Sequence, residues 1–321
     1  MSCICGGSKK PIFEIKFKYS GVNAILMSRK PAVSGLFYEN SPSRLKVQIE
    51  EAFISKFGPK RMPGEVDERK QKSIFAGIVP HAGYPYSAAG ASHFYLELAE
   101  SKKPDCFLIL GTDHTGAGNC LSDQDFETPF GTMKLDTELL AELQRQGIKI
   151  NNHGHSKEHS IEVQIPLLQF IYYDEEKMPT FVPMIVGDYE GLAEKILNAI
   201  HVYETTGKKV CIIVSSDFTH YGFNYGYVPF SSDDAEERLP ELDKGAINFI
   251  LKQDPKKFIS YVQDTGATIC GFNGIAVLLE MIAKLPKEEK PSVRLLKYYN
   301  SGDVVGDYSN AVGYASIIFE K

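Results

Sequence analysis

Short apolar runs alternate with longer amphipathic stretches along most of this chain. Apolar runs bounded by polar residues are typical of strands buried on both faces of a sheet, and here they cover 73–80, 105–111, 180–187 and 209–215. Between and after them, apolar residues recur every three or four positions, which predicts helices. These helical stretches cover 87–99, 136–145, 159–173, 189–203, 235–252 and 273–284.

Strands that alternate with helices of this length predict an α/β fold with a largely parallel sheet and helices over both of its faces. Towards the end of the chain, 293–299 and 311–319 are predicted as further strands. A short helix is predicted over 255–261, because Asp254 is a suitable N-cap and Pro255 favours the first helical position.

Composition excludes several classes of protein. Of the 321 residues, 43% are hydrophobic, which is enough to bury the core of one large domain. The net charge of −6 gives no basic surplus to attract a phosphate backbone, so we expect no nucleic-acid partner. No run reaches the roughly 18 apolar residues of a membrane span, and no secretory leader is evident. The scattered cysteines predict reduced thiols and a cytoplasmic location.

Histidine and aspartate side chains follow the ends of three predicted strands. His81 follows the first strand, His114 the second, and Asp217 and His220 follow the strand over 209–215. A single histidine after a strand is more often a loop or capping residue than a ligand. Because ligands of open parallel sheets gather beyond the carboxyl ends of the strands, three such strand ends predict one shared pocket.

Cys270 precedes Gly271 and the helix predicted from residue 273. A cysteine at a helix N-terminus favours the thiolate, which binds metals or attacks electrophiles, although an ordinary buried cysteine fits the sequence equally well. Two imidazoles with a thiolate suit zinc, copper or iron, whereas two imidazoles with the Asp217 carboxylate resemble non-haem iron sites. The residues alone do not rank these metals.

Other polar residues lie close to these positions along the chain. Tyr84 and Tyr86 follow His81 and can orient a substrate or donate a proton, or else simply pack against the pocket wall. His155 and His159 share a face if their stretch is helical; otherwise only His159 and Glu162 face the site.

Five segments match a known family in order and spacing. They are Pro-His-Ala-Gly-Tyr at 80–84, Leu-Gly-Thr-Asp-His at 110–114, Glu-His-Ser-Ile-Glu-Val-Gln at 158–164, Ser-Ser-Asp-Phe-Thr-His at 215–220 and Thr-Ile-Cys-Gly at 268–271. Together with the stretch 29–38, they resemble the Memo family. The resemblance predicts a single domain over 29–321 and places 1–28 outside it, as a disordered extension or the product of an early start codon, with Met27 as a candidate initiator.

The resemblance implies a three-layer α/β/α fold similar to class III extradiol dioxygenases. It also implies metal ligands at His81, His114 and Cys270, with Asp217 and His220 beside them. Members are described as binding iron or copper and supporting redox chemistry, and prokaryotic members as linked to a radical-SAM-associated system. Asp113 departs from the common family pattern and, if it points inward, can act as a partner of the His114 imidazole.

These features favour a metal-dependent redox enzyme with His81, His114 and Cys270 as ligands to iron or copper, zinc being the other candidate metal. Asp217, His220 and Tyr86 are its predicted catalytic residues. The alternative is a binding module that captures an anionic peptide or small molecule in the same pocket. A third hypothesis pairs Cys270 as a nucleophile with His81 or His220, although no oxyanion hole is evident in the sequence.

Overall fold

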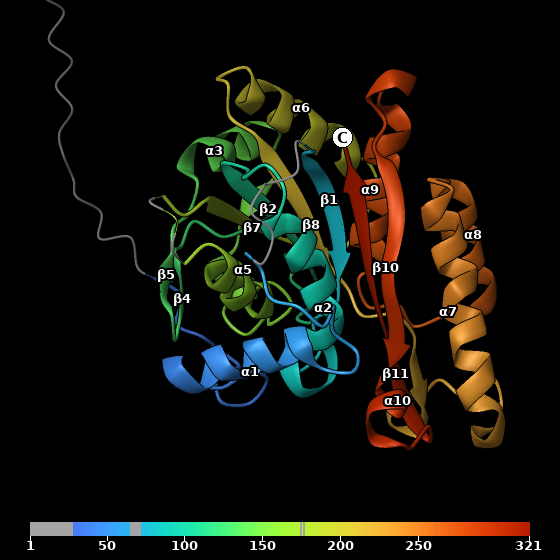
Figure 1. Ribbon diagram of the computed structural model, residues 1–321. Helices are drawn as coiled ribbons and strands as arrows, with labels where there is room; N and C mark the ends of the chain where they lie inside the picture. Colours follow the sequence, from blue (N-terminus) through green and yellow to red (C-terminus); the bar gives the residue numbers. More distant parts are fainter. Residues whose placement is uncertain (1–27, 65–71, 174, 176) are drawn as a thin grey trace, which may run out of the picture.

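The computed structural model describes residues 28–64, 72–173, 175 and 177–321 (Figure 1). In these residues, nine strands form the main sheet in the order β10-β11-β1-β8-β2-β7-β3-β6, with β9 paired to β11. The strands are β1 (Ile74–Val79), β2 (Cys106–Thr112), β3 (Cys120–Leu121), β6 (Lys149–Ile150), β7 (Thr180–Val186), β8 (Val210–Ser215), β9 (His220–Gly222), β10 (Ser292–Asn300) and β11 (Asn310–Glu320). A separate hairpin joins β4 (Phe126–Thr128) to β5 (Gly131–Met133).

The four central strands confirm the predicted parallel core of the sheet. β1, β8, β2 and β7 are parallel neighbours, and nearly all of their residues are buried. A strand covered on both faces exposes no side chains to water, so each of these four strands is a continuous apolar run in the sequence. The long strand β11 pairs antiparallel with β1, and β10 pairs antiparallel with β11 at the edge of the sheet (Figure 1).

Helices cover both faces of the sheet, which confirms the predicted three-layer α/β/α architecture. One face packs against α1 (Pro42–Ile54), α2 (Tyr84–Ala99) and α5 (Ile165–Ile171). The opposite face packs against α3 (Thr137–Arg145), α6 (Leu192–Glu204), α7 (Ala235–Leu251), α8 (Pro255–Thr265) and α9 (Phe272–Lys284). The helices therefore leave the carboxyl ends of the central strands bordered by loops and by the N-termini of α2 and α9.

Several elements differ from the sequence-based prediction. Helix α1 was not predicted, although its buried residues Leu45, Ile49 and Phe53 have helical spacing. The helix predicted over 159–173 begins later, with a 3-10 turn at Glu162–Gln164 followed by α5. The short helices α4 (Asn152–His155) and α10 (Ser301–Val305) and the strands of two or three residues were also missed, because such short elements have no readable periodicity.

Two further sequence-based predictions concern the N-terminal segment and membrane spans. The predicted extension over 1–28 lies, apart from Ser28, outside the described residues, and the single domain over 29–321 stays a prediction. Among the helices that the structure describes, none is long and apolar enough to cross a membrane.

Candidate metal centre

The predicted site residues meet at the carboxyl edge of the central strands. Two groups of potential metal ligands form there, and in each group one ligand atom of every residue lies within 4.8 Å of the others. The first group is His81, His114 and His159; the second is His81, Asp217 and Cys270. His81 belongs to both groups, and neither contains both His114 and Cys270. The edge therefore gathers three imidazoles, a thiol and a carboxylate around His81.

His81 follows β1 and is buried. Its backbone N–H donates to Asp217 Oδ1 at 2.7 Å, its ring Nδ1 lies 3.1 Å from Ser215 Oγ, and its Nε2 lies 3.2 Å from Cys270 Sγ. Burial lowers the pKa of His81 to about 4, because the charged imidazolium loses solvation in the interior. The ring is neutral at pH 7, as a metal ligand must be.

His114 is oriented by the buried carboxylate of Glu158. Glu158 Oε1 lies 3.0 Å from His114 Nδ1, and Oε2 accepts the His114 backbone N–H at 3.0 Å. An ionised carboxylate only accepts hydrogen bonds, so Nδ1 carries the proton and Nε2 has a free lone pair. Burial lowers the pKa of His114, but the hydrogen bond and charge of Glu158 outweigh it and raise this pKa overall. The same contacts hold the pKa of Glu158 well below its ordinary value, against the effect of burial.

Asp113 does not take the role that the sequence suggested for it. Its carboxylate accepts the backbone N–H groups of Ala117 at 2.8 Å and Gly118 at 2.7 Å. Asp113 therefore closes the loop that follows β2, and the carboxylate partner of His114 is Glu158, 44 residues further along the chain.

His159 joins the site, whereas His155 and Glu162 do not. The His159 ring stacks on His114, with centroids 4.7 Å apart and planes at 16°, and burial lowers its pKa. His155 is buried elsewhere, with Nε2 3.2 Å from the Cys120 carbonyl. The Glu162 carboxylate binds Arg29 at 2.7 Å, so the expectation that Glu162 faces the site is wrong.

Cys270 is held against the backbone at the end of β8. Its sulfur accepts the Asp217 backbone N–H at 3.2 Å. A Cβ at Gly271 would lie 2.3 Å from Ser216 Cβ, so only glycine allows this approach. Burial and the charge of Asp217 raise the pKa of the Cys270 thiol far above its ordinary value. Without a bound cation the thiol is protonated at pH 7, which favours the ordinary buried cysteine over the thiolate, the two alternatives that the sequence left open.

Asp217 and His220 lie side by side beyond β8. Asp217 Oδ2 is 3.9 Å from His220 Nε2. Burial raises the pKa of Asp217, but His81 and His220 outweigh it and keep this pKa below its ordinary value. His220 stacks on Tyr225, with centroids 5.1 Å apart. The carboxylate is therefore ionised at pH 7 and lies beside the His220 imidazole.

The two tyrosines after His81 have different environments. Tyr84 is buried, and its hydroxyl donates to the Val163 carbonyl at 2.7 Å, so it belongs to the core. Tyr86, in the first turn of α2, is 43% exposed. Burial raises the pKa of its neighbour Tyr225, and Asp217 and Tyr86 add to this effect. Of the two, only Tyr86 has a side chain exposed to solvent.

The buried carboxylate of Asp243 in α7 supports the segment that carries Asp217 and His220. Asp243 Oδ1 accepts the Thr219 backbone N–H at 3.1 Å, and Oδ2 accepts the Tyr298 hydroxyl at 2.8 Å. Burial raises the pKa of Asp243 from 3.8 to about 6, because it outweighs the hydrogen bonds from Thr219 and Tyr298 and the charge of His220, which lower it. A Cβ at Gly313 would lie 1.9 Å from Oδ2, which shows how tightly the carboxyl group is enclosed.

The raised pKa of Asp243 predicts an unusual pH dependence of stability. The folded chain binds this proton more tightly than the unfolded chain, so between about pH 4 and 6 the free energy of unfolding falls as pH rises. At roughly 1.4 kcal/mol per pKa unit, the loss is about 3 kcal/mol. Asp243→Asn keeps the size and removes the titration, so we expect it to be more stable than the unsubstituted chain at pH 7.5 and equal to it near pH 4. Urea unfolding of both proteins checks this, and a stability difference that does not change with pH contradicts it.

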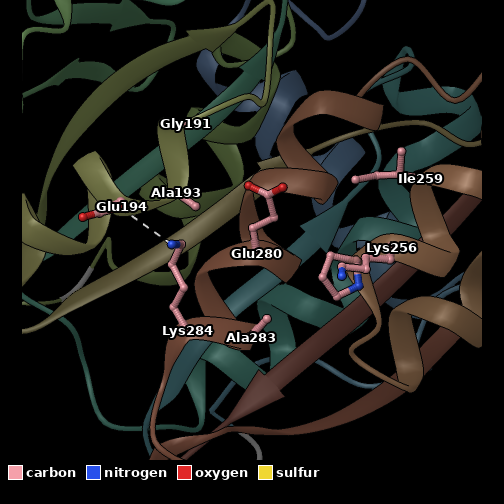
Figure 2. Close-up of a pocket in the computed structure, with 9 residues that line it drawn as sticks. Gly191, Ala193, Glu194, Lys256, Ile259, Glu280, Ala283 and Lys284 are labelled. Carbon is pink, nitrogen blue, oxygen red and sulfur yellow. Dashed lines mark ion pairs between the residues drawn. The ribbon is translucent and has the colours of Figure 1, made fainter.

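A separate pocket of about 370 Å³ lies between α6, α8 and α9 (Figure 2). Lys284 and Glu194 form an ion pair across it, at 3.7 Å. None of the residues of the metal centre lines this pocket, so the two sites are distinct.

The fold and the site together define a class: three-layer α/β proteins with a histidine- and cysteine-rich candidate metal centre at the carboxyl edge of a parallel sheet. Comparison with known proteins gives the family. The Memo-like protein family model matches residues 29–318, and the chain belongs to this family. A MEMO1 family protein of Saccharolobus solfataricus is 37% identical over 300 residues, 91% of this chain and 99% of the relative. Another, from Desulfurococcus amylolyticus, is 36% identical over 301 residues, 92% and 99% of the two chains.

Proposed function

We propose that this chain is a metal-dependent redox protein that binds one iron or copper ion through His81, His114 and Cys270. The observation that carries the proposal is the position of His81, whose buried, neutral imidazole is common to both groups of potential ligands. Neutral imidazoles and a thiolate are donors that iron, copper and zinc accept, and the Cys270 thiol would lose its proton on binding the ion. A bound iron or copper ion would supply one-electron chemistry that the side chains alone lack.

The charge of the site favours a cation. Glu158 and Asp217 are both buried and their pKa values are held below the ordinary range, so two ionised carboxylates, one of them paired with His114, lie beside the neutral His81. An anion entering this pocket meets repulsion unless a cation precedes it. Capture of an anionic peptide or small molecule, the alternative function, therefore also requires the bound ion.

The remaining residues have roles around that ion. Asp217 and His220 are the proposed groups that take and return a proton, which requires the 3.9 Å between Asp217 Oδ2 and His220 Nε2 to shorten to a hydrogen bond. The half-exposed Tyr86 is the proposed residue that orients a substrate. In the metal-free state, the Cys270 thiol and His81 Nε2, 3.2 Å apart, form a direct contact that an ion would replace.

Metal analysis of anaerobically purified protein tests the proposal. We expect one iron or copper ion per chain by inductively coupled plasma mass spectrometry, and its loss in His81→Ala and Cys270→Ser. His201→Ala, an exposed histidine in α6, is the matched control and should keep the ion. Unchanged metal content in the first two variants refutes the ligand assignment. Stoichiometric zinc in place of iron or copper refutes the redox function but not the site.

Two further measurements separate the alternatives. Oxygen consumption by the metal-loaded protein is expected for a redox enzyme; without it, peptide affinity that is lost in His220→Ala favours the binding module. Alkylation of Cys270 distinguishes a ligand from a nucleophile, because a bound ion protects a ligand sulfur from reagent.

A further inference from the structure

A chain of buried hydrogen bonds ends at the ring of His81. Its members Tyr95, Gln164, Ser160 and Ser215 are all fully buried, so water does not supply alternative partners. The hydrogen atoms in such a chain can be assigned by counting, because backbone carbonyls only accept and a hydroxyl has a single proton to donate.

The amide of Gln164 has one allowed orientation. Its Nε2 lies 3.0 Å from the Pro80 carbonyl and 2.8 Å from Ser215 Oγ, while its Oε1 accepts the Tyr95 hydroxyl at 2.7 Å. A flipped amide would place two acceptors against each other at Pro80. Both N–H groups of Gln164 are therefore used, one on Pro80 and one on Ser215.

The hydroxyl of Ser215 then determines the proton on His81. Ser215 Oγ lies 2.6 Å from the Ser160 carbonyl, which must receive the only hydroxyl proton. Gln164 fills one lone pair of Oγ, and the other faces His81 Nδ1 at 3.1 Å. Nδ1 must therefore donate, and the lone pair of the neutral ring lies on Nε2, the atom nearest Cys270.

We propose that Ser215 and Gln164 are positioning residues that fix the His81 tautomer and so keep its Nε2 available as a ligand atom. His114 reaches the same state through the carboxylate of Glu158, whereas His81 does so through a neutral hydroxyl. The two imidazoles therefore present the same nitrogen with different basicity. The tautomer follows from the hydrogen bonds alone; only its consequence for metal affinity rests on the proposed function.

Nitrogen-15 NMR of the metal-free protein tests the tautomer, because imidazole shifts distinguish a protonated ring nitrogen from a bare one. We expect His81, assigned by comparison with His81→Asn, to have the proton on Nδ1. Ser215→Ala should lose this preference. Ser92→Ala is the control, since Ser92 is equally buried and donates to the Ala89 carbonyl, away from the site. A proton on Nε2 in the unsubstituted protein overturns the proposal, whether or not any variant folds.

Metal affinity supplies the second measurement. Loss of an outer hydrogen-bond partner of a ligating histidine weakens binding by about 10- to 100-fold, and we expect this rise in the dissociation constant for Fe(II) in Ser215→Ala but not in Ser92→Ala. Unchanged tautomer and affinity in a folded Ser215→Ala overturn the role of Ser215. If the unsubstituted protein binds no metal, the proposed function fails, while the NMR result still decides the tautomer.

Discussion

Arg29→Ala is expected to lower the free energy of unfolding by about 3 to 5 kcal/mol, the range found when one partner of a buried ion pair is removed. The Arg29 side chain is 3% exposed, and Glu162, its partner at 2.7 Å, is 0% exposed. Glu162 would keep its hydrogen bonds from the Ala32 N–H and the Tyr38 hydroxyl. Among the described residues, Arg29 is the cation that pairs with Glu162, and a buried carboxylate that loses its counter-charge is costly.

Arg29 also connects the start of the domain to the metal centre. Its guanidinium donates to the carbonyls of His155 and Glu158, both at 2.7 Å. These bonds hold the irregular segment that places Glu158 beside His114. We therefore expect Arg29→Ala to weaken metal binding as well as the fold.

Urea unfolding measures the stability effect against a neighbouring ion pair. Lys30→Ala removes an ammonium group whose side chain is 75% exposed, paired with Glu127 at 2.6 Å, and exposed pairs contribute about 0 to 1 kcal/mol. The double substitution Arg29→Met with Glu162→Gln should recover much of the loss, because it removes both charges. If Arg29→Ala and Lys30→Ala lower the free energy of unfolding equally, the buried ion pair contributes no more to stability than the exposed one.

The central sheet is easy to predict from the sequence, because a strand buried on both faces is a continuous run of apolar residues. β1, β2, β7 and β8 coincide with apolar runs, since no residue of theirs needs to face water. Segments whose backbone conformation depends on tertiary contacts have no such pattern in the sequence. The segment before α5 is irregular because Glu158 bonds His114 and Ser160 instead of continuing the helix.

Some residues of the candidate site can likewise be predicted from the sequence pattern, and others cannot. The convergence of His81, His114 and Asp217 could be predicted, because parallel strands deliver whatever follows them to one edge. Cys270 was placed there chiefly by the family resemblance, since nothing local to it points to its contact with Asp217, 53 residues earlier.

The hydrogen-bond partners of the imidazoles were missed for a physical reason. Glu158, Ser215 and Gln164 are ordinary polar residues in the sequence, and only the folded chain shows which donor each one meets. The sequence likewise left a thiolate and an ordinary buried thiol equally open for Cys270, because its pKa depends on burial and on Asp217, which only the folded chain shows. A sequence therefore shows which groups can ligate more readily than it shows their protonation.

Glu158→Gln is expected to raise the Fe(II) dissociation constant by about 10- to 100-fold, with little change in side-chain volume. The Glu158 carboxylate accepts from His114 Nδ1, from the His114 backbone N–H and from the Ser160 backbone N–H. An amide can accept at one end only. In Glu158→Gln the amide NH₂ group must face either a backbone N–H or the His114 ring. If it faces the ring, it donates to Nδ1, which favours the tautomer with the proton on Nε2 and so removes the ligating lone pair.

Isothermal titration of the anaerobic protein with Fe(II) measures this change, and Glu142→Gln is the matched control because Glu142 pairs with Arg145 on the exposed side of α3. The pKa of His114 supplies a second readout. Glu158 raises that pKa, so it should fall in Glu158→Gln, and protons should then compete with the metal only at lower pH. If the pKa falls while the affinity at pH 7.5 stays the same, Glu158 acts on the charge of His114 alone and the orientation argument fails. If both change, the carboxylate sets the direction in which the imidazole presents its lone pair.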